Sequence, residues 1–99
     1  MTTLHVLSHS PFADTRLASC LRLLGPEDGI LLTGDAVYAL APGSSAQRML
    51  ATQLSYNSLF VLAEDLTARH LPAPDGIQTI DYAGFVELSI RFDKVNTWL

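Results

Sequence analysis

The only thiol of this chain, Cys20, is the first group to consider as a chemical reagent. A cysteine thiolate is a nucleophile that can take up a persulfide sulfur, whereas a buried thiol is a small apolar side chain. At about 100° per residue, a helix places Ala13, Leu17, Cys20 and Leu24 on one apolar stripe. The stripe predicts that Cys20 faces the core. As the chain's only thiol, Cys20 remains a candidate catalytic, sulfur-handling residue. Because it is expected to be buried, we do not base the function on it.

Polar groups also follow the predicted strands, at the edge where parallel sheets bind ligands. His9 follows the first strand, and four carboxylates, Asp35, Glu64, Asp65 and Asp81, follow later ones. Such a set suggests acid–base catalysis or a metal site. Each carboxylate also precedes a predicted helix, where it can accept hydrogen bonds from free N–H groups. We expect this capping role, with a ligand site at His9 and Asp35 as the remaining alternative.

The other motifs point away from enzyme chemistry. His5 lies between apolar neighbours inside a predicted strand, and His70 lies at a helix end, so both are expected to be structural. The chain has no glycine-rich phosphate loop, no G-x-S-x-G elbow and no metal-ligand spacing. No cofactor and no metal are therefore expected.

Length and charge narrow the class of protein. The 99 residues fit a single domain over 1–99, and a net charge of −4 with scattered basic residues disfavours direct nucleic-acid binding. One cysteine cannot form an internal disulfide, and no signal-peptide or membrane-spanning pattern is visible, so a cytoplasmic protein is expected. A hydrophobic fraction of 48% suggests that part of the surface is a subunit interface.

Short apolar runs alternate with helical patterns along the chain. The expected strands are 3–8, 30–33, 58–62 and 77–80. The expected helices run from Ser10–Pro11 to Gly25–Pro26, from a Ser44/Gln47 capping box, from Glu64 to Arg69–His70, and over 82–93 after Asp81. This alternation predicts an α/β fold, a parallel sheet with helices on both faces.

Four stretches together resemble the TusB/DsrH family of sulfur-relay subunits. They are TLHVLSHSPF, GDAVYAL, AEDLTARHL and IDYAGFVELSIRFDKVNTW, and they occur in this order between residues 3 and 98, so the resemblance extends over nearly the whole chain. The resemblance implies a DsrE/F/H-like fold and a place in a complex of the TusBCD type, a dimer of heterotrimers with TusC-like and TusD-like chains.

The resemblance also implies a function. In such a complex persulfide sulfur passes from TusA towards TusE and the MnmA thiolase, which forms 2-thiouridine at the tRNA wobble position. The working cysteine belongs to the TusD-like chain, so this chain is expected to be mainly structural and not itself catalytic. Cys20 matches the first-helix cysteine of some DsrH-type members. The alternative is therefore a DsrEFH subunit of dissimilatory sulfur oxidation, with Cys20 as a secondary sulfur-handling residue.

Two apolar helical segments are candidates for the subunit interface. They are 36–40 (AVYAL) and 83–92 (AGFVELSIRF). Because a core must also be filled, at least half of these side chains are expected to be internal.

Overall fold

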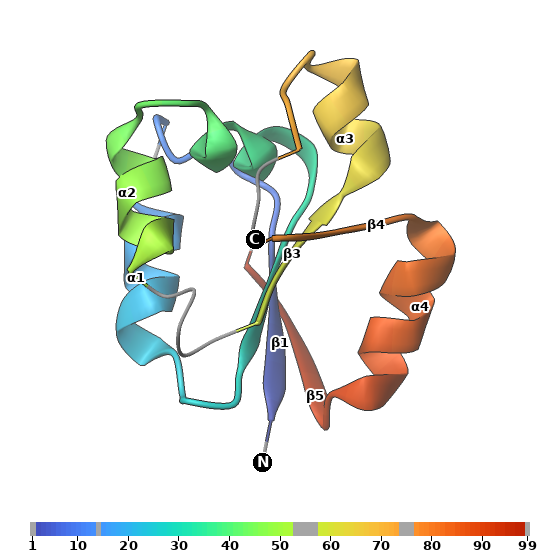
Figure 1. Ribbon diagram of the computed structural model, residues 1–99. Coiled ribbons are helices and arrows are strands. Elements are labelled where there is room, and N and C mark those ends of the chain that lie inside the picture. The colour runs from blue at the N-terminus through green and yellow to red at the C-terminus, as the bar shows by residue number, and fades with distance from the viewer. Residues whose placement is uncertain (1, 14, 53–57, 74–76, 99) are drawn as a thin grey trace.

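A parallel sheet of five strands forms the centre of the protein (Figure 1). The computed structural model describes residues 2–13, 15–52, 58–73 and 77–98. The strand order is β4-β3-β2-β1-β5, and the strands are β1 (Thr3–Leu7), β2 (Gly29–Leu32), β3 (Ser58–Leu62), β4 (Gln78–Ile80) and β5 (Lys94–Trp98). The predicted α/β class, with helices on both faces of the sheet, is confirmed.

Apolar residues on both faces explain the inner strands. All of β2 is buried, and Leu31 and Leu32 point to opposite sides of the sheet. Strand β5 was not predicted, since we expected a helix to residue 93 and assigned nothing to 94–98. It pairs with β1 from Thr3↔Lys94 to Leu7↔Trp98, and four of its five residues are exposed, so it lacks the continuous apolar signal of the inner strands.

The connecting helices are short, and α1 and α4 span less than the ranges expected for them. They are α1 (Arg16–Leu23), the 3₁₀ helix η1 (Gly34–Leu40), α2 (Ser45–Ala51), α3 (Ala63–Ala68) and α4 (Tyr82–Arg91). The predicted caps of two of them are confirmed, because Ser44 accepts a hydrogen bond from the Gln47 amide and Asp81 from the Gly84 amide. Among the described residues, no helix has the length and apolarity needed to cross a membrane.

The predicted start of the first helix at Ser10–Pro11 is wrong. Ser10 instead closes a turn: its hydroxyl accepts from the Phe12 amide and its carbonyl from the Ala13 amide. Helix α1 begins at Arg16, so Ala13 is exposed and not on the buried stripe, whereas Leu17 and Cys20 are buried as predicted. A serine that can accept hydrogen bonds from the following amides is compatible with a turn as well as with the start of a helix.

Two cores lie on opposite faces of the sheet. The α1 face is covered by α1, η1 and α2, with Leu66 of α3 at its border, and the α4 face is covered by α4 (Figure 1). The α1-face cluster contains Leu7, Leu17, Cys20, Ile30, Leu32, Ala36, Val37, Ala39, Leu40, Ala46, Leu50, Leu59, Val61 and Leu66. The α4-face cluster contains Leu4, Val6, Leu31, Phe60, Leu62, Ile80, Leu88 and Phe92.

The two interface candidates have different outcomes. Segment 36–40 is core, because Ala36, Val37, Ala39 and Leu40 are all buried, and its assignment as interface surface is wrong. In segment 83–92 only Leu88 and Phe92 are buried, and several large apolar side chains of α4 are exposed. The outer side of α4 is therefore apolar surface that no other described residue covers.

Candidate functional site at the carboxyl edge of the sheet

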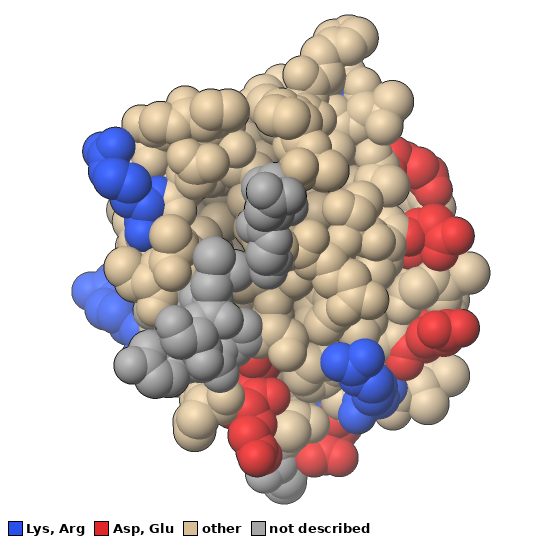
Figure 2. Space-filling view, viewed as in Figure 1, with Lys and Arg blue, Asp and Glu red and all other residues tan. Residues whose placement is uncertain are grey.

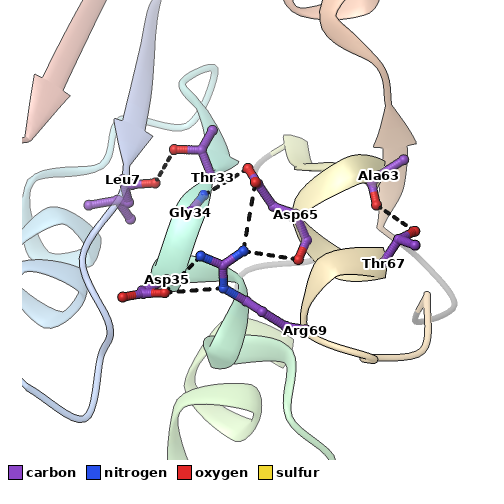
Figure 3. A network of polar contacts seen from close by, with 8 residues as sticks. All are labelled: Leu7, Thr33, Gly34, Asp35, Ala63, Asp65, Thr67 and Arg69. Carbon is purple, nitrogen blue, oxygen red and sulfur yellow. Dashed lines mark hydrogen bonds and ion pairs between the residues drawn. The ribbon is translucent and has the colours of Figure 1, made fainter.

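A polar network joins the ends of β2 and β3, centred on Arg69 (Figure 3). The guanidinium donates to Asp35 Oδ1 from Nη2 at 2.8 Å and from Nε at 3.1 Å. Its Nη1 donates to the Asp65 carbonyl at 3.2 Å and lies 3.7 Å from Asp65 Oδ1. Arg69 also lies over the ring of Tyr38, 5.8 Å from its centroid. One side chain at the end of α3 thus holds η1 against α3.

Asp65 caps a helix other than its own. Its Oδ2 accepts from the Gly34 amide, the first residue of η1, at 2.8 Å (Figure 3). Asp35 was expected to cap this helix and instead pairs with Arg69, so that assignment is wrong. The N-cap residue of α3 is Leu62, whose side chain cannot accept a hydrogen bond. The capping bond expected from Glu64 or Asp65 at the start of α3 is therefore not formed. Capping occurs between elements here, which local sequence patterns do not report.

The backbone at the end of β2 turns sharply at Gly34. Gly34 has a φ of +51°, and a Cβ at this position would lie 3.3 Å from the Ser8 carbonyl oxygen. The preceding Thr33 donates from both its amide and its hydroxyl to the Leu7 carbonyl, at 2.9 and 3.0 Å. Glycine is needed because β1 approaches closely and because its φ is one that L side chains rarely adopt.

A shallow cleft of about 350 Å³ opens beside this network, on the α4 face. Among the described residues, its lining comprises Val6, Thr33, Gly34, Leu62, Asp65, Tyr82 and Phe85. Among the described residues, neither His9 nor Asp35 is part of this lining, and the Asp35 carboxylate is paired with Arg69. Asp65 lines the cleft but is already bonded to Gly34.

His70 terminates α3. Its φ is +54°, its amide donates to the Thr67 carbonyl, and the Leu71 amide donates to the Leu66 carbonyl. These two bonds form a Schellman motif with His70 at the left-handed position that glycine usually occupies. The structural role expected for His70 is thereby confirmed, since its backbone closes the helix.

Cys20 lies in the α1-face core and is fully buried. Burial raises the pKa of its thiol to about 12, and the nearby Asp28 carboxylate adds to the rise. At neutral pH the group is therefore a thiol and not the thiolate that attacks or carries sulfur. In this conformation Cys20 serves as an apolar core side chain.

His5 is a buried, hydrogen-bonded core residue, as predicted. Its Nδ1 accepts from Trp98 Nε1 at 3.0 Å, and its Nε2 lies 3.4 Å from Asp28 Oδ2. Because indole nitrogen only donates, the ring proton of neutral His5 is on Nε2 and faces Asp28. The apolar neighbours of His5 predict its burial but not its partners, Trp98 and Asp28. The usable signal was a polar residue in an apolar strand, which must find partners when it is buried.

Asp28 links the chain segments around His5. Its carboxylate accepts from the Thr3 amide at 3.0 Å and from the Gly25 amide at 2.9 Å. Partial burial acts to raise the pKa of Asp28. The hydrogen bonds from the two backbone amides and the contact with His5 outweigh this effect and hold that pKa below its ordinary value. Asp28 is thus a charged structural link between β1 and the loop that precedes β2.

Most of the candidate site residues make structural contacts within the chain. Among the described residues, no three His, Cys, Asp or Glu side chains are grouped so that they could bind a metal ion. The carboxylates of Asp35, Asp65 and Asp81 bond to an arginine or to helix amides, and the thiol is enclosed. These three carboxylates and the thiol are therefore engaged in the structure of the chain itself.

Comparison with known proteins gives a consistent result at the level of sequence. The family model described as "DsrH like protein" matches residues 9–95. Protein TusB of Yersinia pestis (strain Pestoides F) is 37% identical over 97 residues, covering 96% of this chain and 99% of that protein. Protein TusB of Yersinia pseudotuberculosis (serotype O:1b, strain IP 31758) gives the same values.

Solved structures show the same fold at lower sequence identity. The ychN protein from E. coli superposes with a TM-score of 0.80 at 20% identity, covering 99% of this chain and 100% of that one. Protein MTH1491 from Methanobacterium thermoautotrophicum, described as of unknown function, superposes with a TM-score of 0.70 at 8% identity, covering 96% of both chains. At these identities the likeness establishes the architecture alone.

Proposed function

Since the chain belongs to the TusB/DsrH family, we propose that it is a mainly structural subunit of a hetero-oligomeric sulfur-relay complex. Family membership supports a sulfur-relay-related subunit. The proposal goes further and gives it TusC-like and TusD-like partners in a dimer of heterotrimers. It implies a cytoplasmic protein, because the final substrate of the relay is tRNA.

In this proposal the chain shapes the complex while another subunit carries sulfur. Persulfide sulfur passes from TusA, through the complex, to TusE and then to MnmA, which forms 2-thiouridine at the wobble position. The observation that carries the structural role is the enclosure of the only thiol in the α1-face core, where the pKa of Cys20 is raised to about 12. A sulfur carrier must meet its donor and acceptor, and this thiol is inaccessible to both.

The first experiment tests the assembly. The chain is tagged and purified gently from its own cells, and its native mass is measured. We expect two related α/β chains in equal amounts, in a six-chain assembly. A lone chain of about 11 kDa, recovered without such partners, would contradict the proposal.

The second experiment separates a scaffold from a carrier. Cys20→Ala should cost about 1 kcal/mol of unfolding free energy, because it leaves a small cavity, and should leave tRNA 2-thiouridine unchanged. Nucleoside mass spectrometry gives the modification level, and Ser19→Ala is the matched control on the same helix.

The alternative function predicts a different result from the same variant. A DsrH-type subunit that handles sulfur through Cys20 would gain the mass of one sulfur on this chain, and Cys20→Ala would abolish the gain. Loss of relay in a folded, assembled Cys20→Ala complex would overturn the mainly structural role.

A further inference from the structure

A buried histidine joins the end of β5 to the inside of the sheet. His5 of β1 accepts a hydrogen bond at Nδ1 from Trp98 Nε1, at 3.0 Å. Its Nε2 lies 3.4 Å from Oδ2 of Asp28, in the loop before β2. None of these three side chains has a part in the proposed relay. They form a titratable group of residues, which we call the His5 cluster.

The two contacts of His5 favour different protonation states of its ring. The indole of Trp98 can only donate, so its bond needs an unprotonated Nδ1 and therefore a neutral ring. The carboxylate of Asp28 favours the positively charged ring. Protonation at Nδ1 would leave two N–H donors facing each other where a 3.0 Å hydrogen bond now stands. One proton therefore breaks the bond to β5 and strengthens the contact with the loop.

Asp28 is the charged residue that contacts the His5 ring. On the neighbouring strands the register partners of His5 are Ile30 and Asn96, which do not titrate. The pKa of Asp28 is held below its ordinary value, so Asp28 stays charged near neutral pH, whereas burial keeps Cys20 a neutral thiol. Among the described residues, the charged and titratable side chains on α1, the loop before β2, β2 and β5 are Arg16, Cys20, Arg22, Glu27, Asp28 and Lys94.

The two ends of β5 are attached in different ways. At its start, the Lys94 amide donates to the Thr2 carbonyl at 3.1 Å. Thr2 and Asp93 add two more bonds, from the Thr2 amide to Asp93 Oδ2 at 3.0 Å and from the Asp93 amide to Thr2 Oγ1 at 3.2 Å. None of these bonds involves a histidine. At the other end, the side-chain hydrogen bond seen among the described residues is that of Trp98 with His5.

We propose that protonation of His5 releases the Trp98 end of β5 from the sheet while the end next to Asp93 stays attached. Strand β5 is an edge strand paired with β1 alone, so one end can separate without opening the other strands. Figure 2 shows charged side chains towards the rim of the view and none on the described surface around the C-terminus, so no ion pair on this face replaces the bond to His5. This pH-sensitive switch does not depend on the proposed relay complex.

Hydrogen–deuterium exchange measures the release in the full chain, alone or in the assembly in which it is purified. Peptides that contain β5 or β2 are compared at about pH 8 and about pH 5, the range in which imidazole groups titrate, with rates corrected for the intrinsic effect of pH. We expect β5 amides to exchange about tenfold faster at the lower pH, the effect of losing one buried hydrogen bond, and β2 amides to be unchanged. Unchanged β5 amides, or equal acceleration in β2, would overturn the switch.

Substitution of each of the three histidines of the chain assigns the change to one ring. His5→Asn keeps an oxygen acceptor near the δ position for Trp98 but does not titrate, so exchange of β5 should become independent of pH. His9→Asn and His70→Asn make the same change at exposed positions outside the His5 cluster and should keep the response. Loss of the response in either control, or its persistence in folded His5→Asn protein, would overturn the assignment to His5.

The fluorescence of Trp98, the only tryptophan, reports directly on the end of β5 in the purified full chain. Acidification should move its emission to longer wavelength and increase its quenching by acrylamide, because the indole leaves the α1-face cluster for water. Asp28→Asn, which removes the carboxylate that favours the charged ring, should lower the pH midpoint of this change by about one unit. Dimmer emission at an unchanged wavelength and acrylamide sensitivity would mean a charged ring beside a stationary indole, and would overturn the release.

Discussion

The two faces of the sheet are built in contrasting ways. The α1 face is covered by two helices and a 3₁₀ helix, and its core includes Cys20 and the whole buried part of η1. The α4 face is covered by one helix, and the outer row of that helix (Tyr82, Val86 and Ile90) is apolar and exposed. The difference is that three elements share the cover of the α1 face, whereas one helix with an exposed apolar outer side covers the α4 face.

Chain topology accounts for the asymmetry. Strands β1 to β4 follow one another in one direction across the sheet, and only the step from β4 to β5 returns past them. Because parallel crossovers are right-handed, the returning connection lies on the opposite face from the others. Helix α4 is that connection, and among the described residues it is the only helix that packs on its face.

Glycine residues allow close contact between α4 and the sheet at both ends of the helix. A Cβ on Gly29 of β2 would lie 2.6 Å from Phe92 Cζ, next to the end of α4, and a Cβ on Gly84 would lie 2.9 Å from Ile80 Cβ. Both distances are shorter than real Cβ contacts, so glycine permits the helix to rest directly on the sheet. The α4 face is thus covered by a single helix that packs closely on the sheet.

The largest expected effect compares neighbouring leucines on opposite faces. Leu32→Ala, under the α1 face, should lower the unfolding free energy by about 3 to 4 kcal/mol, and Leu31→Ala, under α4, by about 2 to 3 kcal/mol. Both side chains are fully buried, but a single helix can relax into a cavity more easily than three elements can. Urea denaturation of both variants measures the two costs. A larger cost at Leu31 would reverse the contrast between the faces.

Overpacking of the α4 face should cost less. Gly29→Ala should destabilise the protein by about 2 kcal/mol, because the added methyl group meets the Phe92 ring. The double variant with Phe92→Leu, which shortens that ring, should show less than additive loss in the same denaturation experiment. Strict additivity would show that the two residues are not in contact and that α4 is seated differently.

A pH dependence is expected on the α1 face through Asp28. The folded-state pKa of Asp28 lies below its unfolded value of about 3.9, so its stabilisation is present above that value and is lost as pH falls through the folded pKa. Asp28→Asn should therefore cost about 1 kcal/mol at pH 7, and the difference from the wild type should shrink below about pH 4. Denaturation at a series of pH values measures it. A difference that stays constant down to pH 2 would exclude the charge as the cause.

The smallest effect is expected on the outer row of α4. Ile90→Ser should change the unfolding free energy of the isolated chain by less than about 0.5 kcal/mol, because the side chain is 79% exposed. Leu88→Ala, two residues earlier and buried, should cost about 2 to 4 kcal/mol in the same assay. Comparable losses would mean that the outer row is covered within the chain.

The sequence predicted what local patterns determine. Continuous apolar runs identified β1, β2 and β3, and the caps at Ser44 and Asp81 were correct because both bonds close within three residues. The missed features depend on distant partners. The Asp65 bond to Gly34 spans 31 positions and the Trp98 bond to His5 spans 93, so no local spacing reports them. Strand β5 was missed for the same reason, since pairing with β1, and not its own composition, makes it a strand.

The pairing of β5 with β1 also sets the order in which the protein can be completed. Strand β1 becomes an inner strand only when residues 94–98 are available, and these are synthesised after the other four strands of the sheet. Until then the outer edge of β1 has unpaired backbone groups and His5 lacks the indole of Trp98. In a nascent chain, this edge of β1 is therefore exposed to mispairing until residues 94–98 have been synthesised.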